Sequence, residues 1–229
     1  MVNTYLFAGA SSAIASKSCE ILQAKGHRVI GISTKENSGS YDEHYTVESY
    51  HQGPFPVLDE TIDGLVYFPG TINLKPFHRL SSEEFMHDYQ INALGAVCFI
   101  QYYLLQLKQS TNPSIVLFSS VAAQQGMPFH TSIAMSKSAV EGLTRALAAD
   151  LAPKVRVNCI APSLTNTPLA ERLINTPEKT EALQKRNPLQ KIGSTSELAQ
   201  AVIFLLSKEA SWITGQVLAV DGGMGSLKL

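Results

Sequence analysis

Short apolar runs alternate with longer helical patterns along the whole chain. The runs are rich in Val, Ile, Leu and aromatic residues, and they are continuously apolar rather than interrupted at every second position. Such runs are typical of strands that are buried on both faces of a parallel sheet. We predict strands at 2–7, 27–32, 63–68, 114–119, 156–161 and 216–220, and helices near 13–25, 82–108, 132–151 and 195–207.

This alternation predicts βαβ units, in which a helix crosses between neighbouring parallel strands. The chain contains no internal repeat, low-complexity segment or linker. We therefore expect residues 1–229 to form one α/β domain with a doubly wound parallel sheet.

Two regions depart from the alternation. Residues 34–61 are rich in turn-forming residues and predict at most a short strand near 44–49, so the helix expected between the second and third predicted strands is missing. A long insertion after a strand of this architecture is usually a substrate lid, and we predict one at 162–194. That segment holds two short helical patterns among Pro162, Pro168, Pro177, Pro188 and Gly193.

Composition narrows the possible functions. The 229 residues are 45% hydrophobic, which allows one sizeable core, and the formal net charge is −1. Without Lys/Arg clusters, the chain lacks the phosphate contacts that a nucleic-acid surface needs. Its apolar stretches are too short and interrupted to span a membrane, and no basic residues precede the first apolar run as in a secretory signal.

Cysteine usage indicates a reducing compartment. Cys19, Cys98 and Cys159 are odd in number and widely spaced, which fits reduced thiols in a cytoplasmic protein rather than a disulfide framework. The chain has neither a C-x-x-C nor an H-E-x-x-H pattern, so we predict no metal site.

The first predicted strand leads into AGASSAIAS (8–16) and then into a helix. A tight turn at this place presents backbone N–H groups and the positive end of the helix dipole to a pyrophosphate. Only one glycine is present, so this stretch alone is equally compatible with an ordinary turn between strand and helix.

Further motifs follow in a fixed order, and together they resemble the short-chain dehydrogenase/reductase family over essentially the full length. AGASSAIA is similar to the family's Thr-Gly-x-x-x-Gly-x-Gly loop, with Ala8, Ala13 and Ala15 in place of the threonine and two glycines. The pattern is most similar to 3-oxoacyl-carrier-protein reductases and related ketoreductases. The other matching motifs are YFPG (67–70, where Asn-Asn-Ala-Gly is usual), Asn92 in INALGAV, FSSV (118–121), Lys137, NCIAPSLTNT (158–167) and ASWITGQVLAVDGG (210–223).

The resemblance implies a Rossmann-type fold that binds a nicotinamide dinucleotide across the carboxyl ends of the strands. The added methyl groups of Ala13 and Ala15 should shift the cofactor or weaken its binding. Tyr67 and Phe68 replace two asparagines, so the hydrogen bonds there must be rebuilt. The cofactor-binding residues implied are Gly9, Ser11, Ser12, Ala13, Ile14, Gly70, Asn92, Lys137, Pro162, Thr165 and Thr167, although Thr167 also suits a helix N-cap before Pro168.

The end of the second predicted strand bears on the choice between NADH and NADPH. NAD-using relatives carry an acidic residue there, which accepts hydrogen bonds from the adenosine ribose. Here the position is Ser33, followed by Thr34 and Lys35. No carboxylate repels a 2′-phosphate, and the Lys35 ammonium can pair with it. We expect NADPH rather than NADH, unless Lys35 is merely a solvated turn residue.

The resemblance also implies a set of catalytic residues. The family's reductases transfer a hydride to a carbonyl, while a tyrosine poised by a nearby lysine protonates the developing alkoxide. Asn92, Ser120 and Lys137 match the family's asparagine, serine and lysine. The tyrosine position, thirteen residues after Ser120 and four before Lys137, is Ile133. Isoleucine has no proton to donate, so a general-acid contribution of about 10²–10⁴-fold should be lost there.

Another group would have to supply the proton. His130 lies three residues before Ile133 and seven before Lys137, the spacing at which the enoyl reductase branch of the family carries its tyrosine. An imidazolium is a competent acid at neutral pH, although a capping or surface role suits His130 equally well. Ser120, or a water molecule held by Asn92 and Lys137, is another possible source.

Two functions remain open. One is an NADPH-dependent oxidoreductase acting on a small carbonyl or acyl-thioester substrate with an atypical proton donor. The other is a catalytically impaired NADP(H)-binding protein that serves as a regulatory or scaffolding partner. In either case we expect a homodimer or homotetramer assembled through the helices near 82–108 and 132–151. Small residues that would allow close helix approach are Ala134, Ser138, Ala139 and Gly142.

Overall fold

Seven parallel strands form a single sheet in the order β3-β2-β1-β4-β5-β6-β7. The computed structural model describes residues 2–36 and 39–228. Because every pairing is parallel, the carboxyl ends of all seven strands meet at one edge of the sheet. The strands are β1 (Thr4–Ala8), β2 (Arg28–Ser33), β3 (Glu43–Thr46), β4 (Gly64–Tyr67), β5 (Ser114–Phe118), β6 (Arg156–Pro162) and β7 (Val217–Val220).

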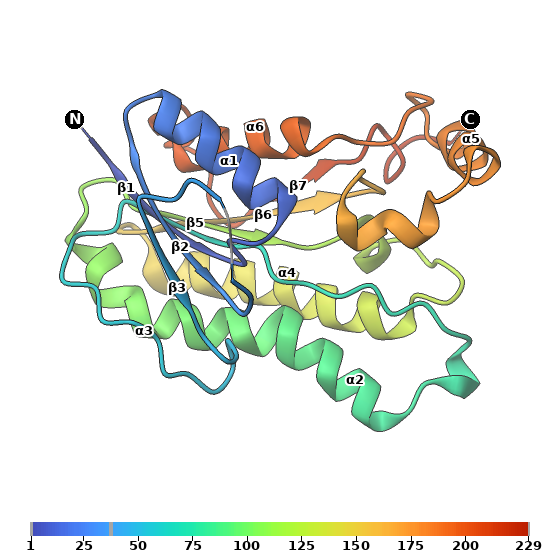
Figure 1. The fold of residues 1–229 in the computed structure, drawn as a ribbon, viewed down its shortest axis with the longest axis horizontal. Helices are drawn as coiled ribbons and strands as arrows, with labels where there is room; N and C mark the ends of the chain where they lie inside the picture. Colours follow the sequence, from blue (N-terminus) through green and yellow to red (C-terminus); the bar gives the residue numbers. More distant parts are fainter. Residues whose placement is uncertain (1, 37–38, 229) are drawn as a thin grey trace.

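Helices cover both faces of the sheet (Figure 1). On one face lie α1 (Ala13–Ala24) and α6 (Thr195–Leu206), and on the other lie α3 (Gly95–Gln109) and α4 (Thr131–Leu151). Successive strand residues belong to different halves of the core, since Leu6 packs on the α3/α4 side and Phe7 on the α1/α6 side. Both faces are therefore buried, and the predicted doubly wound parallel sheet is confirmed.

The predicted helix near 82–108 is continuous but changes its winding in the middle. It begins as α2 (Ser82–Tyr89), passes through a π-helical turn at Gln90–Leu94, and continues as α3. A π turn leaves a backbone carbonyl without its usual helical partner. Here the Tyr67 hydroxyl donates a hydrogen bond of 2.7 Å to the carbonyl of Ile91. Tyr67 thereby rebuilds local hydrogen bonding next to Asn92.

The helix that the sequence lacks after β2 is replaced by an aromatic loop. Among the described residues between β2 and β4, the one regular element is β3. Tyr50 and Phe55 of the following loop pack edge-on against Phe99 of α3, with ring centroids 6.0 and 5.3 Å away. Side chains of α3 also satisfy the carbonyls of the loop: Tyr102 bonds Phe55, Tyr103 bonds Pro56 and Gln106 bonds Leu58.

A buried arginine closes the carboxyl end of α6. Arg156, at the start of β6, is 8% exposed, and burial lowers its pKa. Its guanidinium donates to backbone carbonyls at the end of α6 and just beyond, where helix carbonyls have no partner within the helix. The acceptors are Leu205 and Ala210 at 2.8 and 3.1 Å from Nη1, and Leu206 and Ser207 at 3.4 and 3.1 Å from Nη2.

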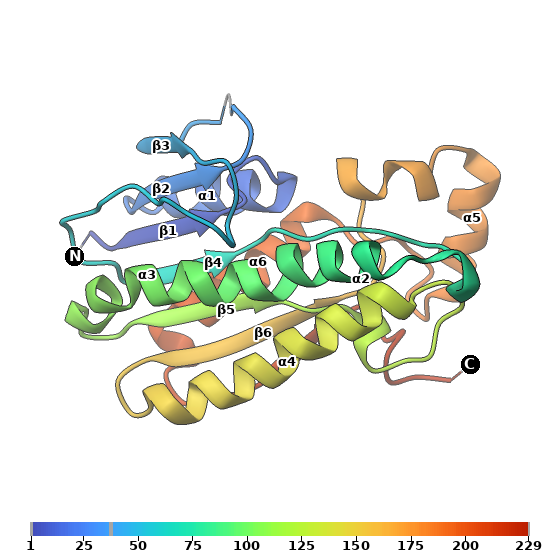
Figure 2. The same ribbon diagram turned by 90° about the horizontal axis from the view of Figure 1, so that it is seen from below.

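The segment after β6 projects beyond the carboxyl edge of the sheet (Figure 2). It contains a 3-10 helix (Pro168–Leu173) and α5 (Pro177–Arg186). Its two ends meet, because Thr165 and Gly193 form an isolated parallel bridge. No helix among the described residues combines the length and apolar character needed to cross a bilayer. The remaining short 3-10 helices are Phe77–Arg79, Val121–Ala123 and Lys208–Ala210.

Candidate active site

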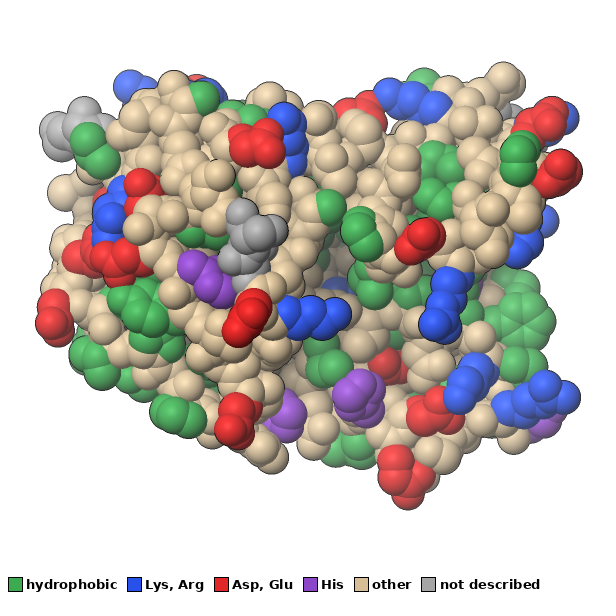
Figure 3. Space-filling view, in the orientation of Figure 1, with side chains coloured by type: hydrophobic (Ala, Val, Ile, Leu, Met, Phe, Trp, Pro, Cys, Tyr) green, Lys and Arg blue, Asp and Glu red, His purple; other side chains and the backbone are tan. Residues whose placement is uncertain are grey.

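A cavity of about 1200 Å³ opens at the carboxyl edge of the sheet. Its walls come from the turn after β1, the loops after β4, β5 and β6, the first turns of α4, and α5. Figure 3 shows the surface hollowed near the middle of this view, with Lys and Arg side chains on both sides of the hollow. The predicted binding segments therefore converge on one space.

The turn after β1 is shaped to receive an anion. Gly9 has a φ of +76°, and a Cβ there would lie 2.9 Å from the Pro69 ring, so only glycine fits. Ser12 is the N-cap of α1, but its side chain makes no capping bond, whereas the N-cap side chains of α2, α5 and α6 do. The first-turn amides of α1 thus remain available to a ligand. Ser11, Ser12, Ala13 and Ile14 line the cavity, while Ala15 is buried in the core.

The end of β2 lies at another part of the cavity wall. Thr34 and Lys35 line the cavity. Ser33 is fully buried; its hydroxyl bonds the Lys35 carbonyl and lies 2.9 Å from His44 Nε2. A ligand at this end would therefore meet Thr34 and Lys35 rather than the Ser33 side chain.

Asn92 and Lys137 face each other across Gly70. A Cβ on Gly70 would lie 3.1 Å from Asn92 Oδ1 and 3.2 Å from Lys137 Nζ. Asn92 Oδ1 is buried without a hydrogen-bond partner, although its Nδ2 bonds Thr71 Oγ1 and the Asp88 carbonyl. Buried polar atoms rarely lack partners, so this glycine-lined space suits a polar ligand group. Asn92 itself lies behind the cavity lining, at 1% exposure.

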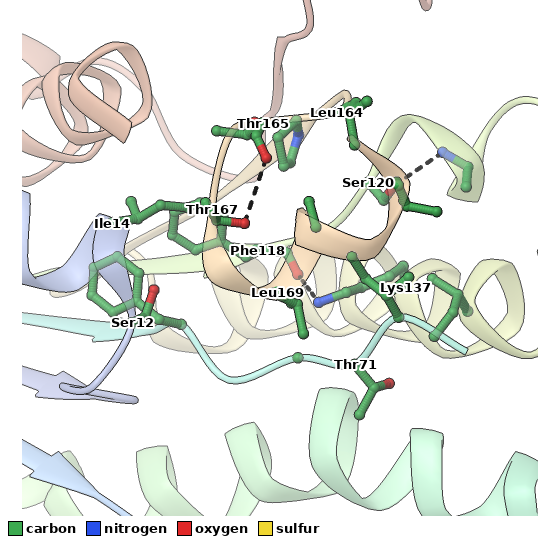
Figure 4. Close-up of a pocket in the computed structure, with 18 of the residues that line it drawn as sticks. Ser12, Ile14, Thr71, Phe118, Ser120, Lys137, Leu164, Thr165, Thr167 and Leu169 are labelled. Atoms are coloured by element: carbon green, nitrogen blue, oxygen red, sulfur yellow. Dashed lines mark hydrogen bonds between the residues drawn. The ribbon is translucent and has the colours of Figure 1, made fainter. Parts of the chain in front are cut away.

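Lys137 is the buried cation of the site. Its Nζ donates a 2.9 Å hydrogen bond to the Phe118 carbonyl (Figure 4), and the residue is 7% exposed. Burial lowers the pKa of Lys137 to about 8, because desolvation disfavours the charged form. In its ammonium form, a lysine with this pKa can donate a hydrogen bond to a ligand hydroxyl group. It can also release a proton near neutral pH.

Ser120, His130 and Ile133 all line this cavity. Ser120 Oγ accepts a 3.2 Å bond from the Ala122 N–H, which leaves its own proton available to a ligand. His130 is the N-cap residue of α4 without a side-chain capping bond, and its Nδ1 lies 2.6 Å from the Pro128 carbonyl. Because a carbonyl can only accept, His130 donates this hydrogen bond through Nδ1–H, which leaves Nε2 without a partner from Pro128. Ile133 lies one helical turn before Lys137, at 5% exposure.

The loop after β6 supplies the facing wall. Pro162, Thr165 and Thr167 all line the cavity. Thr165 Oγ1 bonds the Ser163 carbonyl at 3.1 Å, and Thr167 Oγ1 approaches the Thr165 carbonyl at 3.5 Å. Thr167 occupies the N-cap position before Pro168 but makes no capping bond, so its hydroxyl is free to bind a ligand as well.

Sequence reasoning missed the buried carboxylate beside this site. Asp88 is 1% exposed and accepts hydrogen bonds from Thr71 Oγ1 at 2.6 Å and Ser132 Oγ at 2.5 Å. It thus connects the loop after β4 to the first turn of α4. Asp88 lies four residues before Asn92, so both lie on one helix face. This spacing is the sequence feature that could have identified Asp88.

Known proteins are similar to this chain in both sequence and fold. Residues 58–225 match the family described as enoyl-(acyl carrier protein) reductase. The chain is 37% identical over 165 residues to the 3-oxoacyl-[acyl-carrier-protein] reductase FabG of Thermotoga maritima, covering 71% of this chain and 66% of that one. It is 30% identical over 204 residues to the cyclopentanol dehydrogenase of Comamonas sp., covering 86% and 82%.

The fold comparison agrees. The ligand-free aldohexose dehydrogenase of Thermoplasma acidophilum superposes with a TM-score of 0.89 at 29% identity, covering 99% of this chain and 95% of that one. Fold and cavity together are those of a Rossmann-type family of oxidoreductases. The chain belongs to the short-chain dehydrogenase/reductase family, whose members bind a nicotinamide dinucleotide and act on small molecules.

Proposed function

We propose that this chain is an NADPH-dependent oxidoreductase that transfers a hydride between the cofactor and a small carbonyl or alcohol substrate. The observation that carries the proposal is the meeting of Ser120 and Lys137 with the α1 N-terminus in one cavity, with Asn92 directly behind Gly70. When bound, the cofactor supplies the hydride. Asn92 Oδ1 and Lys137 Nζ would hold the polar groups that enter between them.

NADPH is proposed over NADH because Lys35 lines the cavity where Ser33 and Thr34 offer no carboxylate. Substituting Lys35→Glu should weaken NADPH binding at least about tenfold and leave NADH binding little changed, since a carboxylate would repel the 2′-phosphate. Dissociation constants from NAD(P)H fluorescence test this expectation. Lys25→Glu, at the exposed end of α1, is the matched control.

The residue in the family's tyrosine position is Ile133, so the proton must come from elsewhere. We propose His130, whose Nδ1 is anchored on the Pro128 carbonyl while Nε2 can exchange a proton. In the reductive direction the carbonyl carbon accepts the hydride, the carbonyl oxygen takes the proton from His130 Nε2, and solvent reprotonates the imidazole. Ser120 would donate a hydrogen bond to the same oxygen.

Consumption of NADPH against a panel of β-ketoacyl thioesters and simple ketones tests the proton donor. The wild type should turn over at least one of them, and His130→Ala should reduce kcat by about 10²-fold or more. His87→Ala, which also removes a cavity-lining imidazole, should leave kcat nearly unchanged. Equal effects of the two substitutions would remove His130 from the mechanism.

A second candidate function is an NADP(H)-binding protein without catalysis, which acts on a partner protein. The buried, apolar Ile133 in the cavity wall favours it. In that case the wild type binds NADPH but is inactive, and Ile133→Tyr gains activity on the same panel. Activity of the wild type that Ile133→Tyr does not increase would contradict this alternative.

Three further expectations belong to the proposal. Residues 162–194 serve as a substrate lid over the cavity, the protein acts in the cytoplasm, and it assembles as a homodimer or homotetramer.

Support for assembly comes from α4, where Gly142 is exposed with open space around its Cβ position and Met135 is 48% exposed. Sedimentation analysis of wild type and Gly142→Arg tests it, because a large side chain there should dissociate subunits.

A further inference from the structure

The cavity carries more positive charge than the chain as a whole. The chain has 18 Lys and Arg residues and 19 Asp and Glu residues. Among the described residues that line the cavity, Glu48 is the acidic one, and the basic ones are Lys35, Lys137, Lys179, Arg186 and Lys191. The cavity is thus strongly biased toward anionic ligands.

A nicotinamide dinucleotide explains only part of this charge. Lys35 and Lys137 belong to the proposed cofactor site, and Lys191 forms an ion pair with Glu197. Lys179 and Arg186 remain, both on α5. The Lys179 ammonium bonds the neutral Asn175 Oδ1 at 2.9 Å, and the Arg186 guanidinium makes no hydrogen bond or ion pair with any described residue. No carboxylate therefore neutralises either of these two cations.

The sequence of α5 separates its charges by face. The residues that line the cavity are Lys179, Ala182, Leu183 and Arg186, whose spacing of three, one and three residues defines a single helix face. The acidic residues lie elsewhere, since Glu178 and Glu181 are exposed and do not line the cavity, and Glu181 pairs with Lys185 at 2.6 Å. The face toward the cavity is therefore apolar in its centre and cationic at both ends.

The surroundings of this face are apolar. Leu169 and Leu173 of the preceding 3-10 helix line the cavity beside it. We propose that Lys179 and Arg186 bind an anionic group, a carboxylate or a phosphate, at the distal end of an apolar substrate whose reacting carbon lies beside Ser120. The proposal rests on the proposed function, because it places the reacting carbon at the same site.

Ligand binding to the NADPH complex tests the proposal independently of turnover. The probes are ketones of increasing chain length that end in a carboxylate, their methyl esters, and the corresponding terminal phosphates, measured by calorimetry. The carboxylate or the phosphate should bind at least about tenfold more tightly than the ester of equal length. The double variant Lys179→Gln/Arg186→Gln should lose this preference while keeping its affinity for the ester.

A control substitution and a control affinity measurement allow the binding results to be interpreted. Lys185→Gln removes a cation from the same helix outside the cavity lining and should keep the preference for the anion. The affinity for NADPH should be unchanged in the double variant; if it falls tenfold instead, the two cations serve the cofactor and the inference is wrong. Equal binding of acid and ester, or no binding of the series at millimolar concentration, also overturns it.

Turnover separates this inference from the proposed function. If the anionic ligands bind selectively but no member of the series is reduced or oxidised, the anion site stands and the oxidoreductase proposal fails. If the esters are turned over as efficiently as the acids, the oxidoreductase proposal stands and the anion site fails.

Discussion

Single buried polar side chains set the geometry of this site. Asp88 receives two hydroxyl hydrogen bonds, from Thr71 and Ser132, and its backbone carbonyl receives a third from Asn92. The carboxylate of Asp88 therefore connects the loop after β4 to the start of α4, and its backbone carbonyl connects the same residue to Asn92 in the π turn. Removing a partner from such a group leaves buried donors unsatisfied, which is costly.

Asp88→Asn should lower the free energy of unfolding by about 2 kcal/mol. The amide nitrogen that replaces one carboxylate oxygen cannot accept the hydrogen bond that this oxygen accepts from the Thr71 or Ser132 hydroxyl. Denaturant unfolding measures the change. Glu83→Gln, an exposed change on the same helix, should stay within about 0.5 kcal/mol of the wild type. A loss no larger than that of Glu83→Gln would show that the hydroxyls simply turn to other acceptors.

Lys137 should make stability depend on pH in a defined window. Its pKa falls from 10.5 to about 8 through burial. Below about pH 8 both folded and unfolded chains carry the charge, and burial of the ammonium destabilises the fold. Between these two pKa values the folded protein has released a proton that the unfolded chain keeps. The unfolded state then binds more protons, so stability rises with pH.

Without cofactor, the free energy of unfolding of the wild type relative to Lys137→Met should therefore increase by on the order of 2 kcal/mol between about pH 7 and pH 9.5. Urea denaturation at several pH values provides both curves. Parallel curves would mean that the ammonium is solvated in the folded protein.

At the scale of elements, the aromatic loop after β3 packs against α3 in place of the helix that is missing after β2. Tyr50 belongs to this loop, yet its hydroxyl reaches the turn after β1: it accepts a 2.8 Å bond from the Gly9 N–H and donates a 2.9 Å bond to the Ile32 carbonyl. The loop after β3 therefore supports both β2 and the turn that follows β1. Burial raises the pKa of Tyr50 well above that of an ordinary tyrosine, so the hydroxyl stays protonated at neutral pH.

Tyr50→Phe should cost about 1 kcal/mol of stability and weaken NADPH binding several-fold, because the Gly9 N–H loses one of its hydrogen bonds and keeps the one to the Ile32 carbonyl. Tyr102→Phe is the matched control, since its hydroxyl bonds the Phe55 carbonyl away from that turn. Both variants should lose stability, and only Tyr50→Phe should lose affinity in fluorescence titrations. Identical affinities in the two variants would show that the turn is rigid without Tyr50.

Helices and strands could be predicted where the pattern of neighbouring residues in the sequence determines them. Continuous apolar runs identified the strands, and the missing helix was evident from the turn-rich residues 34–61. The partners of Tyr50, Asp88 and Arg156 were not predictable, because each bonds groups that only the fold brings together. Arg156 illustrates this: its acceptors lie about fifty positions further along the chain. The convergence of Ser120 and Lys137 in one cavity was inferred from a family resemblance rather than from physical pattern alone.

At the scale of the whole molecule, the sheet and the segment after β6 differ in how they are held. The central strands β4 and β5 are completely buried, whereas α5 contains no buried residue. Segments with few buried contacts open at lower free energy than the core. We therefore expect the cavity to have one rigid wall and one wall that opens at lower free energy.

Hydrogen exchange should reveal this difference. Amides of α5 should exchange far faster than those of β5, and saturating NADPH with a bound substrate should slow α5 selectively. Mass spectrometry of peptides covering 168–186 and 114–118 measures both. The reference is α3, because none of its residues lines the cavity. Protection of α5 equal to that of β5 in the free protein would contradict the expectation.

The bridge between Thr165 and Gly193 has a consequence for how such a protein diversifies. The 27 residues from 166 to 192 leave and re-enter the molecule at a single point. Their exchange for the equivalent stretch of another family member would leave every strand pairing intact. The segment therefore forms an exchangeable unit: its sequence can change what the cavity accepts, while the sheet and the Ser120 and Lys137 side chains at its edge stay in place.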